Sequence, residues 1–209
     1  MVDVRQLMGT RRMNRSFSTA SVNPKTMLRI LDDALRSPTA GNSQGVSFLA
    51  LSEPSDRATY WEASTDAAWR STSPRYAGFS RAPIIVLSLC DPASYTTRYA
   101  EADKVASGLG KAPEVWPVPY WFGDAGMATM ALLLGAENQG LSAAFLGTFR
   151  NERAVLNAFH VPEGIRLFGT ILLGHSDGEA HRSKSLDRNM PRGSRIHLGR
   201  YGQRATEEN

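Results

Sequence analysis

A chain of 209 residues with 42% hydrophobic and 21% charged residues is long enough for one globular domain with a sizeable core, which excludes a largely disordered protein. The single cysteine, Cys90, follows an apolar run, so an intramolecular disulfide is excluded and a buried thiol in a reducing compartment is expected. The longest apolar stretch, residues 125–136, is too short to span a bilayer, and the first ten residues lack the apolar segment of a signal peptide. We therefore expect a cytoplasmic protein that does not associate with membranes.

The net charge of +4 is unevenly distributed along the chain. Residues 1–17 carry four arginines against one aspartate, and the segment from His181 carries seven basic residues against three acidic ones, so the body between them is acidic. Because aromatic residues are not interleaved with these arginines, a nucleic-acid partner is not expected. Two basic ends that converge on one phosphate group account better for the pattern.

The chain begins with a short helix, expected at residues 2–8, and an arginine cluster follows it. Arg11, Arg12 and Arg15 stand so close together that their guanidinium groups repel one another unless an anion lies between them. A solvated, charged turn is the alternative interpretation. The cluster precedes a capped helix that leads into a candidate ligand loop, and this position favours an anion site.

That helix starts at Asn23-Pro24, an N-cap followed by proline at the first helical position. It must end before Pro38, because a proline disfavours helical geometry in the preceding residue. Residues 37–44 then form a loop of small and amide side chains, and residues 46–51 form a buried strand. Such a corner offers backbone N–H groups and amides to a flat polar ligand, and we call residues 37–44 the site loop.

Overlapping the site loop is a G-x-S-x-G pattern at residues 41–45 that is typical of a hydrolase nucleophile. Chain order would permit a catalytic triad of Ser43, Asp177 and His197. Such a nucleophile needs a strand before it and a helix after it, whereas here the helix precedes and the strand follows. A serine hydrolase is therefore only an alternative.

Beyond the site loop, helices and strands alternate without a repeat or a linker, which predicts a single α/β or α+β unit. The expected elements are a helix within 54–69, a strand at 82–90, a helix opened by Asp91-Pro92, a long apolar helix at 123–139, a strand at 142–149, a short helix from Asn151 and a strand at 165–173. The apolar helix is expected to be buried on all sides. The last thirty or so residues show no hydrophobic period and are expected to extend over another surface.

Two groups of aromatic residues stand out. The helix within 54–69 carries three that are interpreted as core or interface residues: Tyr60, Trp61 and Trp69. The stiff segment before the apolar helix carries three that form either one wall of a pocket for a flat substrate or a packed connection: Trp116, Tyr120 and Trp121.

Several short motifs, taken in order, resemble the FMN-dependent nitroreductase family. They are R-R-x-x-R-x-F at 11–17, A-L-R-S-P-T-A-G-N-S-Q at 34–44, A-P before the strand at 84–90, E-N-Q-G-L at 137–141, F-L-G-T-F at 145–149 and L-L-G at 172–174. The resemblance implies one α+β domain, residues 1–209, with a central mixed sheet flanked by helices. It also implies an intertwined homodimer with FMN at the interface, and an extended C-terminal arm at about 175–209 that crosses onto the partner.

The same resemblance implies roles for individual residues. The FMN phosphate and the polar edge of the flavin would be bound by four arginines: Arg11, Arg12, Arg15 and, from the arm, Arg188. The flavin ring would be held by site-loop residues of the other subunit: Pro38, Thr39, Ala40, Asn42 and Gln44. The flavin N5 atom would be approached by the backbone around Leu146 and Gly147. Met13 and Gly45-Val46 depart from the family pattern, and Arg192 and Arg195 are alternatives to Arg188.

The implied function is that of an FMN-dependent NAD(P)H oxidoreductase that acts by a ping-pong mechanism. Hydride would pass from NADH, NADPH or a reduced deazaflavin to FMN, and then to a small, flat, electron-poor acceptor such as a nitroaromatic or a quinone. This chemistry requires neither a protein acid or base nor a metal. The remaining alternative is a protein that binds FMN only to store or sense it.

Overall fold

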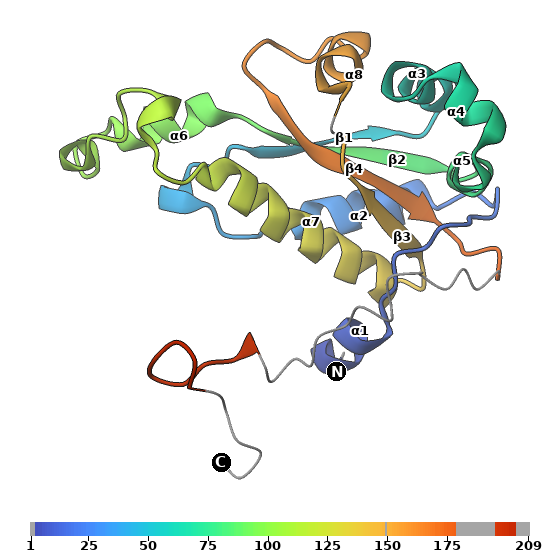
Figure 1. Ribbon diagram of the computed structural model, residues 1–209, viewed down its shortest axis with the longest axis horizontal. Helices are drawn as coiled ribbons and strands as arrows, with labels where there is room; N and C mark the ends of the chain where they lie inside the picture. Colours follow the sequence, from blue (N-terminus) through green and yellow to red (C-terminus); the bar gives the residue numbers. More distant parts are fainter. Residues whose placement is uncertain (1–2, 149, 179–194, 204–209) are drawn as a thin grey trace. The chain divides into compact units, whose positions relative to one another are not determined.

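The computed structural model describes residues 3–148, 150–178 and 195–203 (Figure 1). The chain divides into two units at residue 179, and each is described by itself. All the helices and strands named below belong to the first unit. Most of the expected C-terminal arm, Arg188 included, lies outside the described residues, so the arm stays a prediction.

The first unit combines strands with helices that alternate along the chain, which confirms the α+β class. The elements in chain order are α1 (Val4–Thr10), α2 (Pro24–Ala34), η1 (Ala40–Asn42), β1 (Val46–Leu51), α3 (Pro54–Ser64), α4 (Ala67–Thr72), α5 (Pro74–Phe79), β2 (Ile84–Cys90), α6 (Pro92–Tyr99), η2 (Val105–Ser107), η3 (Pro113–Val115), α7 (Tyr120–Asn138), β3 (Ser142–Leu146), α8 (Glu152–Ala158) and β4 (Arg166–Gly174).

The strands form one sheet in the order β1-β2-β4-β3, and all neighbouring strands pair antiparallel. The end of β1 lies beside the start of β2, since Leu51 is in register with Ile85. The connection through α3, α4 and α5 therefore starts and ends at the same edge of the sheet, and the two strands run antiparallel. In the described residues, the parallel component of the expected mixed sheet is confined to an isolated bridge between Met13 and Ala143. The N-terminal segment therefore runs along the outer edge of β3.

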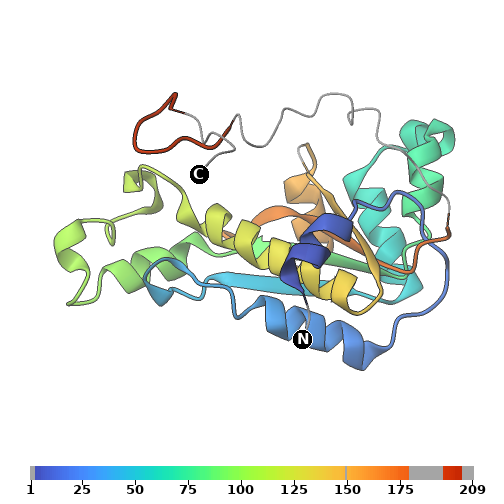
Figure 2. The same ribbon diagram turned by 90° about the horizontal axis from the view of Figure 1, so that it is seen from below.

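Helices cover both faces of the sheet (Figure 1). α2 and α7 pack against each other on one face, where Val86 and Ile171 contribute to the core (Figure 2). α3 and α8 pack on the other face, over Leu87 and Leu172. All residues of β2 are buried, which explains why its sequence is a continuous apolar run and not an alternating one.

Both cap-plus-proline helix starts are confirmed. The Asn23 side chain accepts a hydrogen bond from the Lys25 N–H at the start of α2, at 2.9 Å. The Asp91 side chain accepts one from the Ala93 N–H at the start of α6, also at 2.9 Å. These caps position the two helices that lead into the site loop and pack against it.

A helix within 54–69 is confirmed as α3, but Trp69, expected on the same helix, lies on α4, because the chain from residue 54 to 79 forms three short helices, α3, α4 and α5. The Asp66 side chain accepts a hydrogen bond from the Trp69 N–H and starts α4. Ser73 caps α5 in the same way, just before Pro74. Each cap accepts a hydrogen bond from an N–H group in the first turn of the helix that follows it, a group that has no partner within that helix. It therefore favours the start of a new helix over the continuation of the preceding one.

The expected apolar helix is confirmed as α7, although it starts at Tyr120 and not at Gly123. It is not buried on all sides, since Met127 is 44% exposed.

β3 ends at Leu146, short of the expected Phe149, where its pairing with β4 stops. No helix of the described residues combines the length and the hydrophobicity that a membrane span requires.

Candidate functional site

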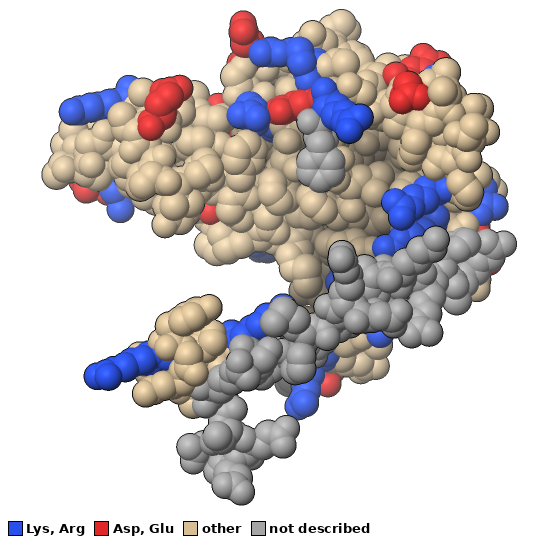
Figure 3. Space-filling model, viewed as in Figure 1, with Lys and Arg blue, Asp and Glu red and all other residues tan. Residues whose placement is uncertain are grey.

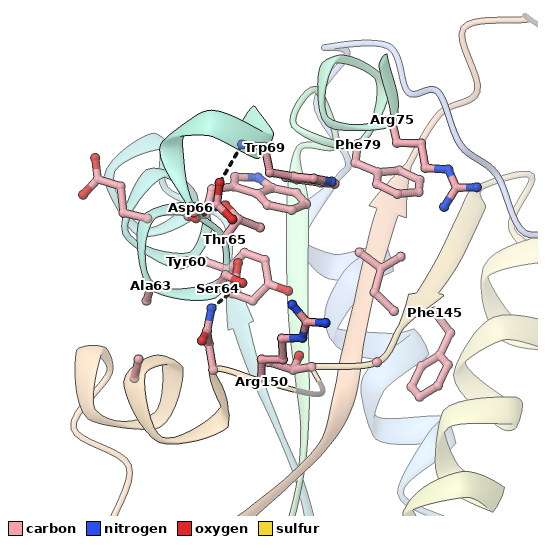
Figure 4. Close-up of a pocket in the computed structure, with 17 residues that line it drawn as sticks. Tyr60, Ala63, Ser64, Thr65, Asp66, Trp69, Arg75, Phe79, Phe145 and Arg150 are labelled. Carbon is pink, nitrogen blue, oxygen red and sulfur yellow. Dashed lines mark hydrogen bonds between the residues drawn. The ribbon is translucent and has the colours of Figure 1, made fainter. Parts of the chain in front are cut away.

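A cavity of about 750 Å³ opens between the α3–α4 corner, α5 and the loop after β3 (Figure 4). Five of the 17 residues that line it are aromatic, and we call it the aromatic cavity: Tyr60, Trp61, Trp69, Phe79 and Phe145. The end of β3 contributes Leu146 and the loop after it contributes Gly147, two of the residues predicted to contact a flavin ring. An aromatic cavity of this size suits a flat ring system.

Two arginines, Arg75 and Arg150, line this cavity, and Lys and Arg side chains gather near α8 and near α5 in the space-filling view (Figure 3). Arg150 points into the cavity and Arg75 points outward from its rim (Figure 4). No hydrogen bond or ion pair among the described residues uses either guanidinium group. Glu62 and Asp66 also line the cavity, but the Asp66 carboxylate is engaged by the Trp69 N–H at 2.6 Å. Of the two arginines, the Arg150 guanidinium is directed at a ligand in the cavity.

The arginine cluster lies beside the elements that form this cavity. The Asn14 N–H donates to the Ala143 carbonyl of β3 at 2.9 Å, next to the bridge formed by Met13. The Phe17 N–H donates to the Gly78 carbonyl of α5 at 3.2 Å. The structure thus brings residues 11–15 and the loop after β3 to the same edge of the sheet.

The three arginines of the cluster differ in their contacts. Arg11 has a buried Nη1 atom with no hydrogen-bond partner among the described residues. Arg15 makes a long contact, at 3.4 Å, with the Met13 carbonyl. Arg12 instead donates to carbonyls at the end of α1 and so caps that helix. Arg11 and Arg15 are available to bind an anion, whereas Arg12 is engaged locally.

A polar cluster that the sequence did not indicate fixes the residue after Arg15. The Arg81 Nη2 atom donates to Asp177 and to Ser16, each at 2.5 Å, and the Ser16 hydroxyl donates to Asp177. Ser16 is buried, so the two bonds of its hydroxyl are shielded from water, whereas the Arg81 side chain is partly exposed. They tie the N-terminal segment to the ends of α5 and β4.

A second cavity, of about 430 Å³, lies between the site loop and α7. Four predicted ligand residues line it: Pro38, Thr39, Asn42 and Gln44. α7 and α2 cover one face of the sheet, whereas α3 and α8, which border the first cavity, cover the other (Figure 1). One chain therefore holds Leu146 and Gly147 in one cavity and these four site-loop residues in the other, and the arginines of the cluster line neither cavity.

The site loop has an unusual backbone conformation. Left-handed φ angles occur at Gly41 (+64°), Asn42 (+57°) and Gln44 (+51°). For a residue other than glycine, this conformation costs roughly 1 kcal/mol or more. A Cβ atom on Gly41 would lie 2.7 Å from the Tyr99 ring, so only glycine fits where α6 meets the loop. The shape of the loop is therefore determined by its tertiary contacts.

The geometry does not favour the hydrolase alternative. The Ser43 hydroxyl donates to the Ala40 carbonyl at 2.6 Å, within the loop itself. Asp177 is engaged with Arg81 and Ser16. A helix precedes Ser43 and β1 follows it, which is the reverse of the order that a nucleophile elbow requires.

The predicted aromatic wall is largely buried. Trp116 and Trp121 are 7% and 6% exposed and pack edge-on against Tyr95, and the Trp116 Nε1 atom donates to the Leu109 carbonyl at 2.9 Å. Of the two interpretations that the sequence offered, a packed connection fits these tryptophans. Tyr120, at 47% exposure, is the member of the group that reaches the surface.

Sequence reasoning overlooked Asp124, a buried carboxylate of α7 that also lines the second cavity. Its Oδ2 atom accepts hydrogen bonds from the Ala40 N–H at 2.8 Å and from the Tyr95 hydroxyl at 2.7 Å. Burial, together with this hydrogen bond, raises the pKa of Tyr95 above its usual value, so the phenol remains a donor. An acidic residue inside an otherwise apolar stretch was the signal that could have indicated this site.

Two further residues were missed, and some predicted ones cannot be placed. Arg75 and Arg150 had no sequence pattern that separates them from ordinary surface arginines. Arg188 and Arg192 lie outside the described residues, and Arg195 belongs to the second unit. The described residues contain no group of His, Cys, Asp and Glu that could hold a metal ion.

Comparison with known proteins identifies related sequences over nearly the whole chain. A model of the nitroreductase family matches residues 8–175. A protein of Archaeoglobus fulgidus, named as a candidate NADH dehydrogenase/NAD(P)H nitroreductase, is 26% identical over 204 residues, which cover 96% of this chain and 100% of the relative.

Solved structures share the fold. A nitroreductase family protein from Streptococcus pneumoniae superimposes with a TM-score of 0.74 at 18% identity, covering 94% of this chain and 100% of that one. Nitroreductase CinD from Lactococcus lactis, solved with nicotinic acid, gives a TM-score of 0.69 at 20% identity and covers 90% and 99%. CinD solved with chloramphenicol gives 0.68 at 18% identity, with the same coverage. At these identities, the likeness concerns the fold alone.

Proposed function

The chain belongs to the nitroreductase family and is an oxidoreductase, and on that premise we propose that two copies of it share FMN sites and transfer hydride from NAD(P)H to a small, flat, electron-poor acceptor. The observation that carries the proposal is that the residues predicted to contact the flavin ring are divided between two cavities. Arg11, Arg15 and Gly147 lie at one edge of the sheet, and the site loop lies beyond α7. A second copy can bring its site loop to the first copy's aromatic cavity.

Exposed apolar residues support a dimer. Helices α1, α2 and α7, together with the C-cap residue of α2, expose Val4, Met8, Leu28, Leu35 and Met127. Leu28, at 60% exposure, belongs to the apolar pattern of α2, yet it does not enter the core of this chain. α7 packs against both α1 and α2, so these residues belong to neighbouring helices. Apolar side chains gathered in this way are typical of a surface that another protein covers.

The residues present fit FMN. The unpartnered Nη1 atom of Arg11 and the guanidinium of Arg15 supply charge-assisted donors for a phosphate, and we assign Arg188 of the arm to the same group. Leu146 and Gly147 would lie against the ring system in the aromatic cavity. The site loop of the second copy would supply the remaining contacts, from Pro38, Thr39, Ala40, Asn42 and Gln44.

FMN, when bound, supplies the hydride chemistry, and the chain binds and orients the reactants. The name of the Archaeoglobus relative supports NAD(P)H as the donor, and a reduced deazaflavin is the alternative. The CinD structures hold nicotinic acid and chloramphenicol, which supports a small acceptor with a flat ring. Tyr120 is assigned to the acceptor side because it is the exposed member of the aromatic segment.

The absorbance spectrum of the freshly purified protein tests the proposal. We expect a yellow protein with about one FMN per chain, reduced by at least one of NADH, NADPH and a reduced deazaflavin when each is supplied alone. A colourless protein that takes up no added FMN would contradict the proposal. A protein that binds FMN and shows no turnover with any of the three donors would instead store or sense the flavin.

A further inference from the structure

Two helices hold the site loop through polar contacts that the proposed chemistry does not use. From α7, Asp124 accepts the Ala40 N–H of the loop and the Tyr95 hydroxyl of α6 on the same oxygen atom. Asp124 is 2% exposed and forms no ion pair with a described residue. A buried carboxylate without a cation is expensive, so packing alone does not account for it.

Arg98 of α6 supplies the second contact. Its Nε atom donates to the Gly41 carbonyl at 2.9 Å. Its two terminal nitrogens donate to the two oxygens of Asp103, each at 2.7 Å, which fixes the guanidinium plane. Arg98 lowers the pKa of Asp103 to about 2, so this pair stays ionised at neutral pH.

The anchored atoms and the ligand residues are separate parts of the loop. The contacts reach backbone atoms of Ala40 and Gly41, both half-buried, whereas the side chains of Pro38, Asn42 and Gln44 are exposed. A loop with an anchored backbone and free ligand side chains is preorganised for binding. The anchors hold the backbone next to Asn42 and Gln44, whose left-handed conformations are also supported by hydrogen bonds from their N–H groups to the Thr39 carbonyl and hydroxyl.

We propose that Tyr95, Arg98 and Asp124 are positioning residues that clamp the site loop in its ligand-binding conformation. The identity of the ligand rests on the proposed function, but the clamp itself does not. Tyr95 acts indirectly, because its hydroxyl donates to the Asp124 carboxylate, which in turn accepts the Ala40 N–H. The clamp links α6 and α7 to a loop far from Asp124 in the sequence.

Hydrogen exchange of the full-length protein tests the clamp without FMN. We expect Asp124→Ala to speed amide exchange in the peptide covering residues 37–45 about tenfold or more, because a charge-assisted hydrogen bond is lost. Tyr95→Phe should give a smaller increase in the exchange rate. The double variant Tyr95→Phe with Asp124→Ala should exchange no faster than Asp124→Ala alone, because Tyr95 acts through Asp124. Asp124→Asn keeps an acceptor oxygen, so its loop should exchange more slowly than that of Asp124→Ala.

Tyr76→Phe is the matched control for Tyr95→Phe. Tyr76 packs against the core beside Trp61 and Trp69, and no hydrogen bond among the described residues uses its hydroxyl. It should leave exchange in the loop unchanged. In every variant, exchange in peptides of β2 and β4 should match the wild type, which separates local loosening from loss of the fold.

FMN titration then connects the clamp to the proposed function. Variants whose loop exchanges faster should bind FMN more weakly, about tenfold for Asp124→Ala. A wild-type protein that does not bind FMN would reject the proposed function and leave the exchange result to decide the clamp. Wild-type loop exchange in both Tyr95→Phe and Arg98→Ala would overturn the clamp even if Asp124→Ala failed to fold, because these two variants each remove one of its hydrogen bonds.

Discussion

At the scale of the residue, the Nη1 atom of Arg11 is buried and has no partner among the described residues. Leaving a buried charged donor unsatisfied costs about 1 to 3 kcal/mol, and a bound phosphate would remove that cost. We therefore predict that Arg11→Ala weakens FMN binding about tenfold or more without lowering the stability of the FMN-free protein. Fluorescence titration with FMN and urea denaturation measure the two effects.

Arg29→Ala is the control for this charge change, because Arg29 lies exposed on α2 in an ion pair with Asp33. It should leave FMN affinity near that of the wild type. Arg12→Ala should reduce affinity less than Arg11→Ala, since the Arg12 guanidinium caps α1. Equal losses in all three variants would indicate a general charge effect and not a phosphate contact.

At the scale of the element, the corner between α3 and α4 forms part of the aromatic cavity and depends on one cap. The Asp66 carboxylate accepts the Trp69 N–H at 2.6 Å and starts α4. Asp66→Ala should destabilise the protein by about 1 kcal/mol, the usual cost of losing an N-cap. The midpoint of urea denaturation measures this change.

The matched control for Asp66→Ala is Ser71→Ala in the same helix. The Ser71 hydroxyl is exposed and bonds only to the Ala68 carbonyl within α4, so its removal should be nearly neutral. If Asp66→Ala proved as neutral as Ser71→Ala, the break between α3 and α4 would have a cause other than capping.

At the scale of the whole molecule, the two cavities of one chain lead to a prediction about pairs of chains. A first double variant, Arg11→Ala with Arg15→Ala, should lose the contacts to the FMN phosphate. A second double variant, Asn42→Ala with Gln44→Ala, should lose the contacts that the site loop makes to the flavin ring. If each site draws on two chains, a heterodimer of the two variants contains one intact site. Random pairing of equal amounts should then restore about a quarter of the wild-type FMN sites.

Co-expression with two different affinity tags allows the heterodimer to be isolated and its flavin to be counted. Each variant expressed alone provides the baseline. Heterodimers that bind no more FMN than this baseline would show that the site is built within one chain, and the shared-site proposal would fail.

Local features of the fold could be predicted because they depend on neighbours in the sequence. The caps at Asn23 and Asp91 use side chains two residues from the N–H groups they satisfy. The burial of Cys90 followed from the apolar run before it, and that burial raises the pKa of its thiol to about 12. Asp66 and Ser73 are caps of the same local kind, so the division of residues 54–79 into three helices could also have been predicted from the sequence.

Taken by itself, the sequence determined the family resemblance, the α+β class, the position of the site loop and the separation of basic ends from an acidic body, because spacing and composition encode these directly. Only the tertiary structure decided that Trp116 and Trp121 face inward and that Asp124 holds Ala40. The last contact joins positions 84 residues apart, and no local pattern specifies which distant N–H group a buried carboxylate will accept. Such pairings emerge when helices pack on a sheet and every buried polar group must find a partner.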